Sequence, residues 1–271
     1  MAFVTIQCAF HSTDRLLRLT LPRAIRSLTV PTKHDFEVVL VADRSTDAVV
    51  HDLIQEIRSL GVDEIRYRAS SRHAFSGAPS NNFHGNQFNS NSRYLVSFTD
   101  DTFFFKREPG FDVLDAAIGA FEAVPNLAVL SKVDDFDEWD FPLVDVEPQL
   151  QDGLRLVNRA VDQFLLYDTE RFGPAARSAG AWDRAQYGKR DGGEFQWENM
   201  VSSVATSNGW AIGFPEGWPL VVRHCDLRQT PGSMHGTQDE EVKLTVYRNL
   251  VRSDGSTKVS PTATAVGLRE Y

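Results

Sequence analysis

The stretch VVLVADRSTD, residues 38–47, joins an apolar run to an acidic, polar loop and decides the fold expected for the chain. Residues 38–41 are continuously apolar, which is typical of a strand covered on both faces of a parallel sheet. Asp43 lies just past the carboxyl end of this strand, and Ser45 or Thr46 can cap the helix that follows. Open α/β sheets bind ligands at that position. We therefore expect the Asp43 carboxylate to accept hydrogen bonds from a nucleobase imide or a ribose hydroxyl.

Composition limits the classes of protein to which the chain can belong. Its 271 residues are 42% hydrophobic and 24% charged, which is enough to bury a substantial core in one large α/β domain. The formal net charge of −9 and the isoelectric point near 5.3 disfavour an extended polyanion as the main partner. We therefore expect no nucleic-acid partner.

The sequence also predicts the cellular location of the chain and the state of its two cysteines. No window of the sequence approaches the roughly 18 apolar residues that a membrane span requires, and MAFVTIQCAF lacks the layout of a signal peptide. We therefore expect no membrane span and a cytoplasmic location. Cys8 and Cys225 cannot form a disulfide framework, so we expect each to be a buried, reduced thiol.

The chain alternates segments typical of strands with segments typical of helices, as in a βαβ opening. A helix is expected over residues 15–28, interrupted or started near Pro22, and a second one runs from the caps at Ser45 or Thr46 to Gly61. The expected strands cover residues 3–9, 36–41, 65–68, 94–98, 127–131 and 219–222.

A pair of carboxylates follows the strand expected over residues 94–98, in the segment RYLVSFTDDTFFFK. Asp100 and Asp101 come at the end of this strand, so they are expected near the same end of the sheet as Asp43. Carboxylate oxygens suit Mg²⁺ or Mn²⁺, and such an ion bridges a diphosphate and neutralises charge on a leaving group. The pattern favours Asp101 as a direct ligand of a divalent cation.

These two segments resemble motifs of the family 2 glycosyltransferases. VVLVADRSTD is similar to their DDGSTD segment, with Ala42 and Arg44 in place of its first Asp and its Gly. Thr99, Asp100 and Asp101 align with the DXD region of GT-A glycosyltransferases, and Thr99 stands in place of the first Asp. The departure at Thr99 makes Asp101 the safer metal ligand and leaves Asp100 on the nucleotide side.

A third acidic segment, GGEFQWENMVSSV at residues 192–204, begins a predicted helix. A carboxylate at a helix N-terminus is stabilised in its ionised form, which suits a group that binds an acceptor hydroxyl or takes its proton. The segment resembles the acceptor side of family 2 enzymes, with Asn199 in place of the Asp of their Glu-Asp motif. An amide cannot act as a base, so Glu198 is the candidate base, with Asp183 and Glu194 in reserve. A Glu-Asn pair also resembles the retaining polypeptide N-acetylgalactosaminyltransferases, so both stereochemical outcomes stay open.

A late histidine completes the set of candidates. His224 follows the strand expected over residues 219–222, and several GT-A enzymes supply a histidine metal ligand from a late strand. The resemblance therefore implies Asp101 and His224 as metal ligands. It also implies that the backbone around Ala9 to His11 contacts the nucleoside together with Asp43.

Together, the motifs resemble a GT-A glycosyltransferase, nearest to family 2. The implied fold is α/β with a mostly parallel central sheet flanked by helices. The implied domain covers residues 1–225, with a nucleotide half to about residue 102 and an acceptor half from 103, followed by an extension at 226–271. The implied activity is transfer of a sugar from a nucleotide-diphospho-sugar, UDP-linked as the first guess, to a glycan, lipid-linked or small-molecule acceptor through its hydroxyl or amine, with Mn²⁺ or Mg²⁺.

Two other functions remain open. A non-catalytic protein of the same fold could bind a nucleotide sugar or a glycan without turnover, because the departures at Thr99 and Asn199 fall in the chemical motifs. A sugar-nucleotide pyrophosphorylase is less favoured, because the segment after the first strand, FHSTDRLLR, lacks the glycines of a phosphate-binding loop.

Overall fold

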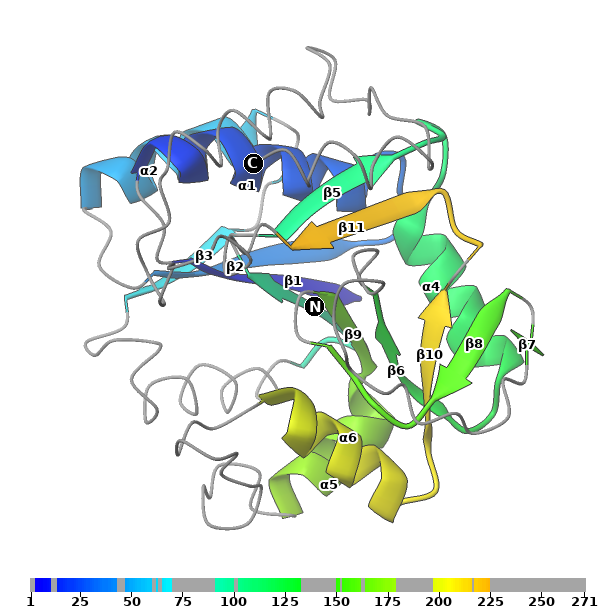
Figure 1. Cartoon of the computed structure of the whole chain (residues 1–271). Coiled ribbons are helices and arrows are strands. Elements are labelled where there is room, and N and C mark those ends of the chain that lie inside the picture. Colours follow the sequence, from blue (N-terminus) through cyan, green and yellow to red (C-terminus); the bar gives the residue numbers. More distant parts are fainter. Residues whose placement is uncertain are drawn as a thin grey trace, which may run out of the picture.

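A central sheet with helices on both faces forms the body of the molecule (Figure 1). The fold was analysed in a computed structural model. It describes residues 3–10, 14–42, 47–59, 62, 65–69, 91–99, 102–132, 150–151, 153–161, 164–178, 197–215 and 217–224.

Among the described residues, the central sheet has nine strands, and most of them run in the same direction. Two strands, β9 and β8, run against their neighbours. In spatial order the strands are β3 (Ile65–Ala69), β2 (Phe36–Ala42), β1 (Val4–Phe10), β4 (Tyr94–Thr99), β9 (Phe164–Asp168), β6 (Leu127–Ser131), β10 (Ala211–Pro215), β8 (Leu154–Val157) and β7 (Leu150–Gln151).

Two hydrophobic clusters cover the central sheet, one on each face. The helices α1 (Asp14–Thr29), α2 (Asp47–Arg58) and α4 (Val113–Ala123) supply apolar side chains to the first cluster. The helices α5 (Thr169–Ser178) and α6 (Trp197–Ser207) supply the second. Side chains alternate along β4 accordingly, because Val96 lies in the first cluster and Leu95 in the second. The predicted α/β architecture is confirmed.

A separate two-stranded antiparallel ribbon lies on the same face as α1. It consists of β5 (Thr102–Lys106), which follows β4 after two residues, and β11 (Leu220–His224) (Figure 1). We name it the β5–β11 ribbon. At its far end Lys106 donates hydrogen bonds to the carbonyls of Val30 and Phe111, the latter at 3.2 Å, and burial lowers the pKa of Lys106.

Most sequence predictions for the first hundred residues are confirmed within one or two residues. The run at 38–40 is buried, with side chains no more than 4% exposed, and Cys8 is a buried free thiol. The expected interruption at Pro22 is wrong, since α1 runs continuously from Asp14 to Thr29. A proline inside a helix costs about 3 kcal/mol. Here the buried face of the same helix, with Leu21, Ile25 and Leu28, offsets that cost.

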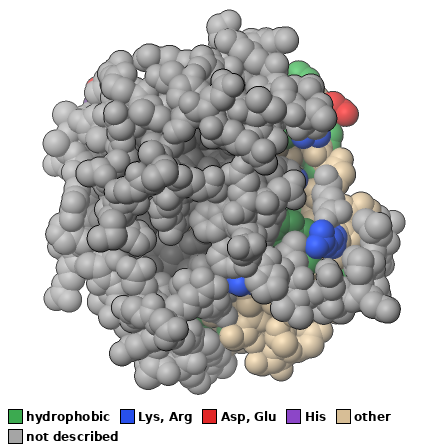
Figure 2. All heavy atoms as spheres, viewed as in Figure 1, with side chains coloured by type: hydrophobic (Ala, Val, Ile, Leu, Met, Phe, Trp, Pro, Cys, Tyr) green, Lys and Arg blue, Asp and Glu red, His purple; other side chains and the backbone are tan. Residues whose placement is uncertain are grey.

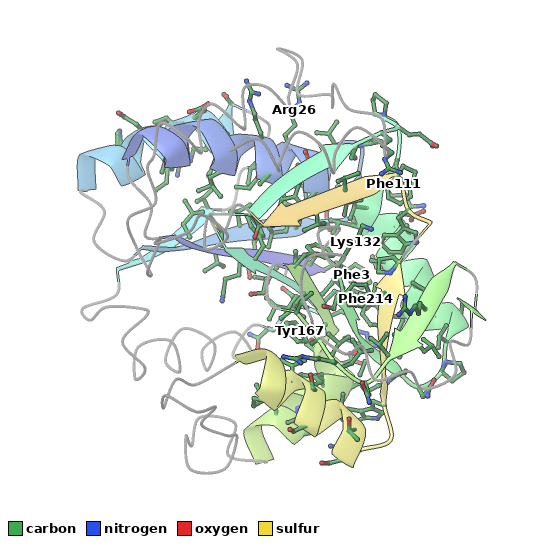
Figure 3. All side chains as sticks on the ribbon, in the orientation of Figure 1. Phe3, Arg26, Phe111, Lys132, Tyr167 and Phe214 are labelled. Atoms are coloured by element: carbon green, nitrogen blue, oxygen red, sulfur yellow. The ribbon has the colours of Figure 1, made fainter. Side chains whose placement is uncertain are left out.

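The exposed part of the described surface is mixed in character. In the space-filling view, described side chains come into sight along the right margin, where hydrophobic, basic and acidic types alternate (Figure 2). The large hydrophobic side chains exposed among the described residues are Phe3 and Val30. Most other apolar side chains point into the two clusters, as Tyr167 and Phe214 do in the second (Figure 3).

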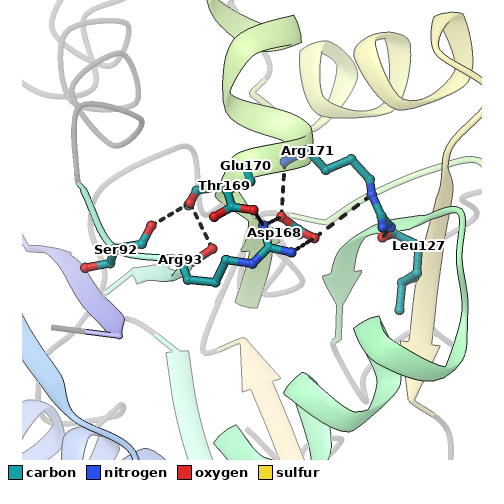
Figure 4. Close-up of polar contacts among 7 residues, drawn as sticks. All are labelled: Ser92, Arg93, Leu127, Asp168, Thr169, Glu170 and Arg171. Carbon is teal, nitrogen blue, oxygen red and sulfur yellow. Dashed lines mark hydrogen bonds and ion pairs between the residues drawn. The ribbon is translucent and has the colours of Figure 1, made fainter.

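A polar seam joins β4, β9, β6 and α5 (Figure 4). The carboxylate of Asp168, at the end of β9, accepts two hydrogen bonds from the Arg93 guanidinium, one of them at 2.8 Å. It also accepts one from the Arg171 backbone N–H at 3.1 Å, in the first turn of α5. The Thr169 hydroxyl donates to the Arg93 carbonyl at 2.8 Å, and the Arg171 side chain donates to the Leu127 carbonyl. These contacts fix α5 against the strands.

Candidate functional site

Three strands deliver the predicted nucleotide-binding segments to the same end of the central sheet. In the parallel ladder Phe10 of β1 is level with Ala42 of β2, and Ala9 is level with Thr99 of β4. The residues that follow these strands therefore leave the sheet side by side. We call this end the carboxyl end of the sheet, and the opposite end its amino end.

The β5–β11 ribbon returns a late part of the chain to this end. β5 starts two residues after β4, and antiparallel pairing places His224, the last residue of β11, opposite Thr102, the first residue of β5. Directly opposed residues of an antiparallel pair have Cα atoms about 4.5–5.5 Å apart. His224 was expected just after its strand and is instead part of it. Its backbone lies next to that of the residue following Asp101.

Helix α6 carries Glu198, from the predicted acceptor-side segment, in its first turn. Three residues separate its last residue, Ser207, from β10, where the Ala211 N–H donates to the Asn126 carbonyl at 2.8 Å at the amino end of the sheet. Since α6 packs on β10 and α5 and spans about 16 Å at 1.5 Å per residue, its amino-terminal residues point away from the amino end. The backbone of Glu198 is therefore on the side of the carboxyl end.

A buried lysine at the carboxyl end was missed by the sequence analysis. Lys132 directly follows β6 and its side chain is 3% exposed. Its ammonium donates a hydrogen bond to the Pro215 carbonyl, at the end of the adjacent strand β10, at 3.1 Å (Figure 3). The available signal was a lysine two residues after the wholly apolar run LAVL, with only Ser131 between them. Lys132 ties two strand ends together and brings a positive charge close to the end of the sheet where the predicted carboxylates follow their strands.

The described residues do not by themselves contain a metal centre. Among them, no group of three or more His, Cys, Asp or Glu side chains lies close enough together to hold an ion. Likewise, no helix in the described ranges is long and apolar enough to span a membrane.

The structure places some of the predicted site residues by their backbones. Ala9 and His224 lie in β1 and β11, which lead to the carboxyl end of the sheet, and Glu198 lies at the start of α6, on the side of that end. The other candidates lie outside the described residues: His11, Asp43, Asp100, Asp101, Asp183 and Glu194. Four of these, at positions 11, 43, 100 and 101, directly follow the aligned ends of β1, β2 and β4 in sequence.

The fold of this chain is similar to that of known structures. No protein-family model and no curated protein sequence matches the chain. The chain is similar to the structure of the mannosyltransferase PcManGT from Pyrobaculum calidifontis in complex with GDP-Man and Mn²⁺, at 14% identity and a TM-score of 0.53. That alignment covers 79% of this chain and 57% of the mannosyltransferase.

A second similar protein is TarS of S. aureus. Residues 1–349 of TarS in complex with UDP-GlcNAc align at 12% identity with a TM-score of 0.53, covering 98% of this chain and 70% of that one. A longer TarS structure aligns at 13% identity with a TM-score of 0.54, covering all of this chain and 42% of that one. The chain thus spans little more than half of the mannosyltransferase and less than half of the longer TarS chain. At these identities the likeness concerns the fold, and the chain has the fold of GT-A glycosyltransferases.

Proposed function

We propose that this chain is a glycosyltransferase that moves a sugar from a nucleotide-diphospho-sugar to an acceptor hydroxyl or amine with the help of a divalent cation. The observation that carries the proposal is the convergence at the carboxyl end of the sheet. The ends of β1, β2 and β4 are level there, and the ribbon register sets His224 beside Thr102. Structures with the same fold hold GDP-Man with Mn²⁺, or UDP-GlcNAc.

The nucleoside would bind where β1 and β2 end. In this proposal Asp43 accepts hydrogen bonds from the base or the ribose, and the backbone from Ala9 to His11 contacts the nucleoside. Asp100 lies on the nucleotide side of the carboxylate pair. Uridine is the first choice of base, and the sugar-diphosphate extends toward β4. The nucleotide half would end near residue 102 and the acceptor half would follow to residue 225.

The donor set suits a divalent cation. One carboxylate and one imidazole, from Asp101 and His224, are oxygen and nitrogen ligands of the kind that Mn²⁺ accepts, and the ribbon register supports their proximity. Mg²⁺ is the alternative ion. When bound, the ion would neutralise charge on the diphosphate as it leaves. Asp101 and His224 would hold it between the ends of β4 and β11.

Glu198 would act on the acceptor from the amino-terminal turn of α6. The helix dipole favours its ionised form, and an ionised carboxylate can take the proton of an attacking hydroxyl. Asp183 and Glu194 are reserve candidates for this role. If the product keeps the anomeric configuration of the donor, Glu198 instead positions the acceptor or stabilises charge.

Nucleotide binding tests the donor site directly. A nucleoside diphosphate that binds only the native state stabilises it by about 2.7 kcal/mol at a concentration one hundred times its Kd. We expect UDP to raise the melting temperature, and Mn²⁺ to increase this shift. Calorimetry with UDP, GDP and dTDP at millimolar concentration, each with Mn²⁺, checks the result. Absence of binding by all three would overturn the donor-site assignment.

The Asp101→Asn variant tests the cation site. The amide keeps the size of the side chain and removes its charge, so metal-dependent nucleotide binding and turnover should fall steeply while the melting temperature changes little. Asp115→Asn, an exposed aspartate on α4, is the control. Metal dependence equal to that of the control would move the ligand role to another residue.

The Glu198→Gln variant tests the base. General-base catalysis contributes about a hundredfold to ten-thousandfold in rate, so turnover should fall on that scale while donor affinity is nearly unchanged. Glu170→Gln is a matched control, because Glu170 is also the second residue of its helix, but α5 starts at the amino end of the sheet. Donor hydrolysis must be measured separately, since water can replace the acceptor. A variant that keeps most of its transfer rate would refute the assignment.

A non-catalytic binder of nucleotide sugars is the second candidate, and Thr99 and Asn199 are the residues that favour it. Nucleotide binding without transfer to any of a panel of glycan, lipid-linked and small-molecule acceptors would support it. Sugar transfer to one of these acceptors would exclude it.

A further inference from the structure

Among the described residues of the β5–β11 ribbon, one aromatic side chain, that of Phe104, packs on rings of the central sheet. Phe104, in the middle of β5, is 5% exposed. Its ring packs edge-on against Phe98 of β4, with centroids 5.1 Å apart, and against Phe164 of β9, with centroids 5.6 Å apart. Phe98 and Phe164 are themselves register partners in the sheet. Phe104 therefore packs against a cross-strand aromatic pair and joins the ribbon to two strands.

Phe104 is close in sequence to one proposed cation ligand, Asp101, and is paired across the ribbon near the other, His224. The Phe98–Phe104 contact joins the two strands that flank Asp101 in sequence, because Phe98 of β4 precedes Asp101 by three residues and Phe104 of β5 follows it by three. Across the ribbon, Phe104 is level with Val222, which is buried and lies two residues before His224.

The remaining contacts of the ribbon hold it along its length. The Ser27 hydroxyl of α1 donates a hydrogen bond to the Phe104 carbonyl at 3.5 Å, and the Arg107 N–H donates to the Pro219 carbonyl at 2.8 Å, beyond the paired residues. The far end is thus fixed by backbone and polar contacts, and Phe104 supplies the aromatic packing nearer to His224.

We infer that Phe104 is a positioning residue for the divalent cation: it holds β4 and β5, which flank Asp101 in sequence, and through the ribbon pairing it holds β11, which ends at His224. This inference rests on the proposed function, because it concerns the cation site proposed there. Loss of an outer partner of a metal ligand typically weakens metal binding about tenfold to a hundredfold. Because Phe104 acts through packing, a loss of about tenfold in Mn²⁺ affinity is the expected effect of Phe104→Leu.

The chain offers a closely matched control. Phe121 of α4 is 4% exposed, belongs to the same hydrophobic cluster and stacks on Tyr94 at 5.5 Å, at the opposite end of β4 from Phe98. Phe121→Leu removes an equivalent ring contact to β4 far from the ribbon. Its Mn²⁺ affinity should stay within about twofold of that of the parent protein, since distant sites act independently.

The experiment is a titration of each variant with Mn²⁺ in the presence of UDP, following the free-ion signal by electron paramagnetic resonance, with melting temperatures measured in parallel. The expected result is a selective rise of the Mn²⁺ Kd in Phe104→Leu, at a melting temperature similar to that of Phe121→Leu. If Phe104→Leu does not fold, Val222→Ala, on the facing strand, replaces it and should show the same selective rise.

Two results would overturn different claims. Equal Mn²⁺ Kd values in the ribbon variant and in Phe121→Leu would overturn the positioning role of Phe104 and leave the proposed function standing. A parent protein that binds UDP equally well with and without Mn²⁺ would overturn the metal-dependent function, and the role of Phe104 with it.

Discussion

The two halves of the central sheet are built differently. The amino half, strands β3, β2, β1 and β4, is wholly parallel, and its ladders pair residue by residue without interruption. The carboxyl half, strands β9, β6, β10, β8 and β7, mixes directions, includes strands of two and four residues, and shifts register between Ala211 and Ile212. The first half is regular enough to align three strand ends, which the proposed nucleotide site requires.

The halves also differ in what joins them. Within the amino half, adjacent strands are held by their ladders and by one continuous apolar cluster. At the junction between the halves, the β4–β9 ladder is supplemented by the polar seam around Asp168, whose side chain is 2% exposed. A buried carboxylate must be paired and hydrogen-bonded to be tolerated, and Asp168 is both.

The largest expected effect comes from breaking this seam. Asp168→Asn keeps the shape of the side chain but removes the charge that faces Arg93, and it weakens the cap at the start of α5. Removing one partner of a buried ion pair costs about 3–5 kcal/mol. Because Arg93 is 28% exposed, we expect the lower part of that range, about 3 kcal/mol. Urea unfolding of the variant measures the loss.

Glu170 provides the control for this prediction. It also pairs with Arg93, at 2.8 Å, but its side chain is 76% exposed. Exposed ion pairs contribute about 0.2–1 kcal/mol, so Glu170→Gln should change stability by no more than that. Equal losses in the two variants would mean that the seam does not depend on the buried carboxylate.

The contrast between the parallel amino half and the mixed carboxyl half of the sheet also explains how far the fold could be predicted from the sequence. In the amino half, apolar runs alternate with helical periodicity, so β1, β2, β3 and β4 were predicted within a residue or two. In the carboxyl half, β9 and β10 were missed, because five-residue segments such as FLLYD and AIGFP do not reveal strand direction or even strand character. β5 was also missed, because the aromatic run TFFFK does not show by itself that it pairs with β11, more than one hundred residues later.

For the candidate site, the sequence predicted residue types but not the contacts that assemble them. The strand ends before Asp43 and Asp100 followed from pattern alone. The register that sets His224 beside Thr102 did not, because a pairing between residues so far apart in sequence depends on packing of the whole ribbon. The side-chain roles of Asp43, Asp101, Glu198 and His224 remain predictions.

A second prediction applies the same substitution to a crowded glycine of the carboxyl half and to an uncrowded glycine of a helix. Gly213 lies on β10, and a Cβ there would come within 2.9 Å of the side-chain tips of Leu127 and Leu130, both fully buried. Overpacking of a core costs about 1–3 kcal/mol, and we expect Gly213→Ala to fall in the lower part of that range because side-chain tips can move. Thermal unfolding provides the measurement.

Gly119 is the matched glycine without close neighbours. It lies inside α4, where a Cβ meets nothing within 4 Å. Glycine inside a helix is less favourable than alanine by about 0.5–1 kcal/mol, so Gly119→Ala should stabilise the protein by that amount. A stabilising Gly213→Ala would show that β10 and β6 are packed more loosely than the distances indicate.

The smallest expected effect concerns a carboxylate that contrasts with Asp168 in exposure. Asp115 on α4 accepts hydrogen bonds from Lys33 and His34, which lower its pKa below the usual value of 3.8, and its side chain is 50% exposed. A depressed pKa in the folded state means that the ionised form stabilises the fold above the pKa of the unfolded state. That contribution is lost as the pH falls through the lower, folded pKa.

Solvent screening limits exposed pairs of this kind to less than about 1 kcal/mol, so Asp115→Asn should slightly lower stability at pH 7. The difference from the parent protein should shrink as the pH is lowered through the titration of Asp115. Urea unfolding at a series of pH values between neutral and strongly acidic checks this, and a difference that grows toward acid would contradict the assigned pairing.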